Sequence, residues 1–202
     1  MYNPSVHQIK DTDSILALIK EYPFAILITQ SEVGPVATHL PVLVEQNDPL
    51  ILGAHMAKAN PHWKFFESGT PSMLIFNGPH TYISPSRYVT RPNVPTWNYV
   101  AIHAYGDIEV VSDPIACVDH LKTMVDAMDP NLKASHPEST EVELLRSKLS
   151  GVVVFRMKVD RLEAKAKLNQ NKPEQDRLAV RDQLFESSDP QEVRMAQMMN
   201  GD

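Results

Sequence analysis

Cysteine is almost absent from this chain, because Cys117 is the only one among 202 residues. A single thiol cannot close an internal disulfide, and it cannot build a thiolate zinc site by itself. The sequence therefore excludes a disulfide-stabilised secreted fold and a cysteine-rich zinc domain. A reducing compartment, the cytoplasm, is the expected location.

Long apolar runs and an excess of basic residues are missing as well. No segment reaches the roughly 18 to 20 apolar residues of a membrane span, and the first residues do not have the pattern of a secretory signal. Lys and Arg number 19 against 25 Asp and Glu, which gives a net charge of -6. This charge opposes broad binding to a nucleic-acid backbone, although it allows a small basic pocket. We expect no membrane partner.

Several common catalytic motifs are absent too. The chain has no G-x-G-x-x-G, no Walker P-loop, no H-E-x-x-H and no G-x-S-x-G, which removes the commonest nucleotide, zinc-protease and hydrolase functions. Its eight histidines fall on separate segments without an i, i+4 pair beside an acid, so no metal site is predicted. Cys117 has no basic activator nearby and is expected to be a half-buried, unreactive thiol.

Apolar periodicity and turn residues predict strands joined mostly by short turns, with helices gathered at the ends and in one insertion. Asp11 or Asp13 caps a first helix that Pro23 ends. Gly106 indicates a bulge or a close backbone approach within the longest strand. The predicted strands are 25–29, 36–44, 50–56, 72–76, 96–111 and 151–159. Helices are predicted near 11–22, 60–66, 114–128 and 138–149, and one C-terminal helix is predicted within 173–199. A long loop covers 77–95, and its length indicates a function.

This order of elements predicts a mainly β (α+β) fold, an antiparallel barrel of about six strands with peripheral helices. Alternating βαβ units are missing, which argues against a doubly wound sheet. We expect residues 1–202 to form a single domain, with a helical insertion at about 114–149 and a C-terminal helical tail at about 173–199.

Four segments are more specific together than any one motif: ATHLPVLV (37–44), HMAKANPHW (55–63), GPHTYISPSRY (78–88) with VPTWNYVAIHAYG (94–106), and KLNQN (167–171). In this order they resemble the PaiB family of FMN-binding negative transcriptional regulators, from Tyr2 to about Arg177. Ala166 and Asn169 depart from the family pattern, in which an aromatic residue and a serine are expected.

The resemblance implies a six-stranded split β-barrel of the FMN-binding type, and a cytoplasmic homodimer with FMN at the subunit interface. It also implies repression of sporulation and degradative-enzyme genes, although the fold is a better guide than a propagated name.

An FMN site needs donors for a doubly negative phosphate, hydrogen bonds to the ring edge, and an apolar or aromatic wall. The matched segments supply all three. The same residues also have ordinary structural explanations that involve no ligand, namely a solvated lysine, a proline-protected edge strand, core aromatics and a solvated loop. The residues that the resemblance implies are His55, Lys58 and Asn60 for the phosphate; Thr38, His39, Leu40 and Pro41 for the ring edge; Trp97 and Asn98 for the ring; and Lys167, Gln170 and Asn171.

Three functions remain open at this stage. The leading one is a flavin-dependent redox or regulatory protein, with an oxidoreductase activity undecided because no proton donor or nucleophile stands out, so no catalytic residue is named. A DNA-binding repressor is the second, without a helix-turn-helix pattern to support it. The third is a heme-binding or heme-degrading split barrel with His39, His55 or His80 as ligand.

Overall fold

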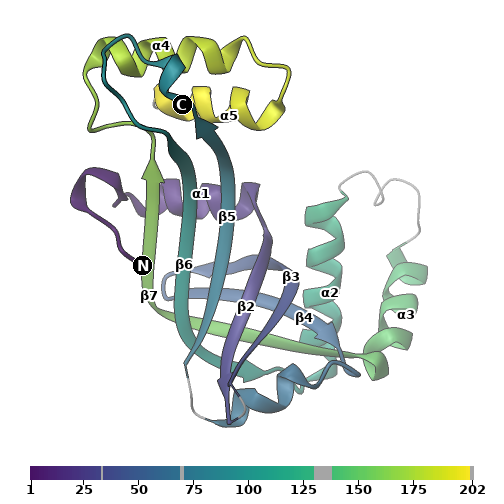
Figure 1. Ribbon diagram of the computed structural model, residues 1–202. Helices are drawn as coiled ribbons and strands as arrows, with labels where there is room; N and C mark the ends of the chain where they lie inside the picture. The colour runs from purple at the N-terminus through teal and green to yellow at the C-terminus, as the bar shows by residue number, and fades with distance from the viewer. Residues whose placement is uncertain (33, 69–70, 130–137, 201–202) are drawn as a thin grey trace. The chain divides into compact units, whose positions relative to one another are not determined.

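The computed structural model describes residues 1–32, 34–68, 71–129 and 138–200 (Figure 1). The connection between the predicted strands 25–29 and 36–44, and the predicted insertion at about 114–149, each include residues outside these ranges. The strands are β1 (Gln8–Ile9), β2 (Phe24–Ser31), β3 (Gly34–Asn47), β4 (Leu50–Ala57), β5 (Ser72–Ile83), β6 (Thr96–Val110) and β7 (Val152–Lys167). The α-helices are α1 (Thr12–Glu21), α2 (Pro114–Met128), α3 (Glu138–Lys148), α4 (Glu174–Phe185) and α5 (Pro190–Asn200). The 3-10 helices are η1 (Ser5–His7), η2 (Pro61–Ser68), η3 (Pro85–Arg87) and η5 (Leu149–Gly151).

The seven strands pair in the order β1-β7-β4-β3-β2-β5-β6, and β6 also pairs with β7. Six strands, β2 to β7, therefore form a closed ring of pairings, and the two-residue β1 adds to β7. The predicted antiparallel six-stranded barrel with peripheral helices is confirmed, with β1 as one strand more than expected.

The chain divides into two compact units, and β5, β6 and β7 each run from one unit into the other. Unit 1 is Met1–Tyr22, Phe76–His103 and Glu163–Asp202, and unit 2 is Pro23–Ile75 and Ala104–Leu162. The single domain expected for 1–202 stays a prediction. Within the described ranges, no helix is long and apolar enough to cross a membrane.

Unit 2 is built around the β2–β3 hairpin, whose register pairs Ala25 with Leu40. Leu27 and Phe155 are completely buried in its core, as alternating apolar residues on strands predict. Helix α2 begins at Pro114, where the Asp113 carboxylate accepts from backbone N–H groups of the first turn. Helices α2 and α3 lie side by side (Figure 1).

Unit 1 contains α1 and the C-terminal helices α4 and α5. Asp11 caps α1 by accepting from the Ser14 N–H (2.8 Å), and the helix ends before Pro23, as predicted. Helices α4 and α5 lie side by side (Figure 1). They form a second core with β5 and the segment that follows it, made of Ile83, Tyr88, Val180, Leu184, Met195 and Ala196. The ion pairs Arg87–Glu192 and Arg194–Glu21 tie α5 to other parts of unit 1.

Two glycines permit close contacts between strands. A Cβ at Gly106 would overlap the Lys158 carbonyl oxygen of β7, which confirms the predicted close approach. A Cβ at Gly78 would lie 2.9 Å from the Val100 side chain. Gly78 therefore belongs to a paired strand, and the predicted loop at 77–95 is shorter than expected because β5 continues to Ile83.

Two further sequence predictions were wrong. Strand β7 continues to Lys167 rather than ending near Val159, because β1 pairs with it at Ala164 and Lys165. The C-terminal segment forms two helices instead of one, separated before Pro190, since proline is favoured at a helix start and cannot continue the preceding one.

Candidate functional site

Thr38, Asn60 and His62 form a hydrogen-bonded cluster in unit 2. The Asn60 amide donates to Thr38 Oγ1 (3.1 Å), its oxygen accepts from the His62 backbone N–H (3.0 Å), and Thr38 Oγ1 lies 2.7 Å from Nδ1 of His62. The His62 ring is fully buried, and burial lowers its pKa, so the ring is neutral at pH 7. Its Nε2 has no hydrogen-bond partner in the described part of the chain. Two of the predicted segments thus meet here. His62 lies inside the HMAKANPHW segment but was not singled out from the sequence.

The ring-edge segment Thr38–Pro41 lies where β3 is paired on one side. Residues 34–41 pair with β2, and the register with β4 begins at Val42. Pro41 therefore lacks its N–H at a place where no bond to β4 is needed. Leu40 is buried, whereas His39 is exposed and stacks on Phe24 with ring centroids 6.2 Å apart. This unpaired edge fits both a ligand site and a proline-protected strand.

His55 belongs to a chain of polar side chains between β3, β4, β7 and α2. Arg156 Nε donates to Glu45 Oε2 (2.5 Å), and His120 Nδ1 lies 2.7 Å from Glu45 Oε1. His120 Nε2 lies 3.3 Å from His55 Nδ1. Burial alone would raise the pKa of Glu45, but the hydrogen bonds from His120 and Arg156 hold that pKa below its usual value.

For a neutral His120, the hydrogen bonds of this chain determine which nitrogen of each ring carries the proton. Glu45 accepts, so His120 carries a proton on Nδ1, and in a neutral ring its Nε2 is an acceptor. His55 must then donate from Nδ1, which leaves its own Nε2 as an acceptor. Burial, together with the neighbouring His120, lowers the pKa of His55. A neutral His55 therefore accepts a hydrogen bond at Nε2, and donation to a phosphate, the predicted role, requires a protonated ring.

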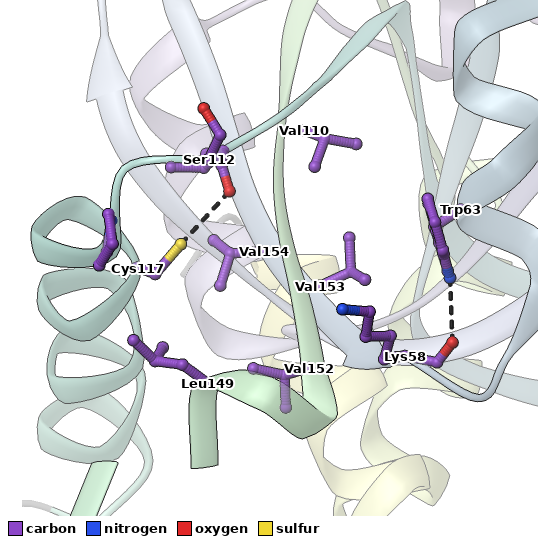
Figure 2. Close-up of a pocket in the computed structure, with 11 residues that line it drawn as sticks. Lys58, Trp63, Val110, Ser112, Cys117, Leu149, Val152, Val153 and Val154 are labelled. Carbon is purple, nitrogen blue, oxygen red and sulfur yellow. Dashed lines mark hydrogen bonds between the residues drawn. The ribbon is translucent and has the colours of Figure 1, made fainter. Parts of the chain in front are cut away.

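Lys58 lines a pocket of unit 2 that we call the valine pocket (Figure 2). The cavity has a volume of about 270 Å³. The Trp63 ring N–H donates to the Lys58 carbonyl oxygen (3.1 Å), and the Lys58 N–H donates to Gly151 (2.9 Å). The residues that line the valine pocket are Lys58, Trp63, Val110, Val111, Ser112, Pro114, Cys117, Leu149, Val152, Val153 and Val154.

In unit 1, Lys167 ends β7 with its ammonium group on the first residues of β6. It donates to Thr96 Oγ1 and to the Trp97 carbonyl oxygen (2.9 Å). Trp97 itself is 54% exposed. Two residues that were predicted separately, Lys167 and Trp97, are therefore brought together within this unit.

Lys167 is one of three lysines that form a cluster, with Lys165 and Lys172. Burial lowers the pKa of Lys167, and the charges of Lys165 and Lys172 lower it further. Lys165 is 5% exposed and bonds the Tyr2 carbonyl oxygen (3.2 Å), while Lys172 bonds Asn93 Oδ1 (2.5 Å). In the described residues this lysine cluster bonds neutral oxygens and faces tyrosine rings, and no carboxylate pairs with it. Such a concentration of positive charge favours an anion.

An aromatic pocket of about 390 Å³ lies in the same unit, lined by Asn77, Gly78, His80, Trp97, Tyr99 and Val100. It shares two residues with the surroundings of the lysine cluster. Lys165 lies over the Tyr99 ring, 4.9 Å from its centroid, and Lys167 bonds the Trp97 backbone. The Tyr82 ring lies edge-on to Trp97, with centroids 6.1 Å apart. Aromatic walls and ammonium groups are thus adjacent.

The remaining predicted residues of unit 1 have different surroundings. Gln170 accepts from the Leu168 N–H (2.7 Å) and donates to the Ala166 carbonyl (2.6 Å) within its own turn, and its oxygen also lies 2.9 Å from His7 Nδ1. Asn171 is exposed. Asn98 is completely buried, and neither atom of its amide has a partner among the described residues. Gln170 therefore shapes the turn, and Asn98 retains unused bonding capacity.

Metal-binding and thiol chemistry find little support in the described residues. No group of three or more His, Cys, Asp or Glu side chains converges there as metal ligands would. Cys117 is 9% exposed, and its thiol donates to the Val111 carbonyl oxygen (3.3 Å). Burial raises the pKa of this thiol, as does the nearby Asp113.

Residues 1–161 match the protein family described as "Putative FMN-binding domain". The chain belongs to this family. The resemblance inferred from the four segments is therefore confirmed, and the FMN-binding family covers the three segments that end before residue 107. The KLNQN segment lies beyond the matched residues.

Curated relatives extend the similarity of this FMN-binding family member over almost the whole chain. Protease synthase and sporulation protein PAI 2 of Bacillus subtilis is 34% identical over 98% of this chain and 96% of its own length. An uncharacterised protein of Emericella nidulans is 29% identical over 89% of this chain and 88% of its own.

Solved structures show the fold that the family member shares. The FAD and heme binding protein of Mycobacterium smegmatis matches 86% of this chain and 79% of its own, with a TM-score of 0.65 and 18% identity. The flavocytochrome Anf3 of Azotobacter vinelandii matches 83% of this chain and 73% of its own, with a TM-score of 0.62 and 17% identity. The fold is thus the split β-barrel type expected from the sequence.

Proposed function

We propose that this protein binds FMN and acts as a flavin-dependent redox or regulatory protein. The observation that carries the proposal is the lysine cluster of unit 1 beside the aromatic pocket. FMN joins a doubly negative phosphate to a planar aromatic ring, and ammonium groups and aromatic side chains bind these two parts. Membership of the FMN-binding family supports the same cofactor.

The lysine cluster would hold the phosphate, with Lys167 also fixing the backbone at Trp97. Trp97 would cover a face of the ring. The FMN contacts that the resemblance implies for Thr38–Pro41 and Asn60 of unit 2 stay a prediction of their own, which substitution of Asn60 in the same titration tests. Bound FMN supplies reversible electron or hydride transfer.

The test is an absorbance and fluorescence titration of the purified protein with FMN. We expect Lys165→Met and Lys167→Met to weaken binding by about tenfold each or more, because each removes a charge-assisted hydrogen bond. Lys20→Met is the matched control, since it removes the same charge from an exposed position on α1 of the same unit.

Two results contradict the proposal. The first is a folded protein that neither copurifies with FMN nor takes it up. The second is a loss of affinity for Lys20→Met as large as the loss for Lys167→Met, because binding would then reflect net charge alone.

A homodimer is proposed on the family expectation, and size-exclusion chromatography of the same sample tests it. Heme is the alternative cofactor, supported by the exposed His80 in the aromatic pocket. A Soret band after heme titration that is lost in His80→Ala, with no flavin uptake, would replace FMN by heme.

DNA binding and a cytoplasmic location stay predictions. Helices α4 and α5 are joined by a short turn, but the charged side chains Glu192 and Arg194 of α5 are both in ion pairs, and the net charge of the chain is -6. A basic recognition face is therefore missing from α5. A gel-shift assay with promoter DNA at increasing salt concentration tests the repressor function.

A further inference from the structure

We propose that the valine pocket of unit 2 binds a small apolar carboxylic acid, with Lys58 as the partner of the carboxylate. This site is separate from the proposed FMN site, and it does not depend on FMN being bound.

The walls of the pocket are apolar. Five valines, Leu149 and Pro114 line it, together with the Trp63 ring (Figure 2). Val153 and Val154 are buried beneath it on β7. Because apolar surface gains by leaving water, such walls favour a hydrocarbon or aromatic ligand over a polar one.

Lys58 supplies the charge. It is an exposed residue and, within the described ranges, the only Lys, Arg, Asp or Glu side chain that lines the cavity. Among the residues that the structure describes, its ammonium group has no ion pair and no hydrogen bond, although its backbone N–H and C=O groups are both bonded. Figure 2 shows the ammonium group turned toward Val153 and Val154. A cation without a partner beside an apolar cavity complements a ligand with one negative end.

The size and the charge define the ligand class. A cavity of about 270 Å³ lies just below the range of about 300–1,000 Å³ that is usual for small-molecule sites. A phosphate would need more donors than one ammonium group. A monocarboxylate with a short aliphatic or aromatic body fits both limits. Assigning Lys58 to this pocket leaves the FMN phosphate to the lysine cluster.

Two side chains report on occupancy. Trp63 lines the pocket with its ring N–H bonded to the Lys58 carbonyl oxygen, a bond that substitution of the Lys58 side chain leaves in place. Cys117 lines the opposite wall and is the chain's single thiol. A ligand in the pocket therefore shields a unique alkylation site.

The experiment is a calorimetric titration of the full chain with octanoate, with 1-octanol as the uncharged analogue. We expect saturable binding of octanoate, weaker binding of 1-octanol, and slower alkylation of Cys117 by iodoacetamide when octanoate is present. Lys58→Met should weaken octanoate binding by about fivefold or more, the effect of losing one partly exposed ion pair. Lys158→Met is the matched control, because Lys158 is an exposed lysine of the same unit that does not line the pocket, and its effect should stay within about twofold.

Each of four results would overturn the proposal. These are no binding of octanoate, equal binding of 1-octanol, an equal loss of affinity in Lys158→Met, and displacement of octanoate by FMN. Displacement would mean that Lys58 serves the FMN phosphate instead. If FMN does not bind at all, the octanoate titration still shows whether the valine pocket binds a carboxylate. This proposal and the proposed function therefore fail separately.

Discussion

Glu45 is the residue whose replacement we expect to disturb unit 2 most directly. Its carboxylate accepts from His120, whose side chain is completely buried, and from Arg156, whose side chain is 39% exposed. A buried donor left without a partner costs about 1–3 kcal/mol, whereas an exposed ion pair contributes about 0–1 kcal/mol. Glu45→Leu should therefore lower the free energy of unfolding by about 1–4 kcal/mol.

Urea unfolding at pH 7, followed by circular dichroism, measures this loss. Arg156→Met removes the other partner of the same carboxylate, and we expect a loss below about 1 kcal/mol because water replaces it. Glu45→Gln should lie between the two, since the amide oxygen still accepts from His120 but without the charge.

The pH dependence provides a second criterion. The folded-state pKa of Glu45 is lowered. Its contribution is therefore complete above the unfolded value of about 4.3 and is lost as the pH falls through the folded-state value. The difference between the native protein and Glu45→Gln should shrink over that range. Equal losses for Glu45→Leu and Arg156→Met, or a difference that does not change with pH, would refute this account of the chain.

Three further outcomes follow from other contacts. Gly106→Ala should lower the free energy of unfolding by about 1–3 kcal/mol in the same urea assay, because its Cβ would overlap the Lys158 carbonyl oxygen. Gly151→Ala is the control and should change the free energy of unfolding by less than about 0.5 kcal/mol, because no atom lies within 4 Å of the added Cβ. Asp176 accepts from the Val89 and Thr90 N–H groups (2.8 and 2.9 Å) and from Thr90 Oγ1 (2.6 Å). Asp176→Asn should therefore speed limited proteolysis near residues 89–93, measured by mass spectrometry of the fragments. Unchanged cleavage would show that these bonds do not hold the segment. Burial lowers the pKa values of His55 and His62. Their contribution to stability is therefore present above the unfolded value of about 6.5 and is lost as the pH falls through the folded-state values. The drop in unfolding free energy between pH 7.5 and pH 5 should be smaller in His55→Gln than in the native protein.

Local patterns were sufficient for several elements. Asp11 as a cap and Pro23 as a stop define α1, because capping and proline geometry act within one helical turn. The alternation along 96–111 predicts that Val100, Ile102 and Ala104 share one face of a strand, and all three are buried on β6, since side chains on a strand alternate whatever it packs against. The four segments also identified the family from the sequence.

Other elements depended on partners that are distant in the sequence. The run that follows Arg161 is charged and looked like a loop, but pairing with β1 makes it the end of β7 and buries Lys165. Gly78 and the residues after it looked like a loop until the contact with Val100 placed them in β5. A strand is completed by a neighbour, so its length cannot be read from its own residues when they are polar or rich in glycine.

The sequence by itself determined the fold class, the FMN-binding family and the segments that carry the predicted site residues. Only the tertiary structure decided which side chains meet. His120 lies 65 residues from His55 and 75 from Glu45, and it joins them because α2 packs on the strands of unit 2. Likewise, Lys167 reaches Trp97 across 70 residues, and Lys58 faces valines of β6 and β7. Composition and spacing record the chemistry of each residue, whereas electrostatic and apolar contacts depend on distances that exist only after the strands have paired.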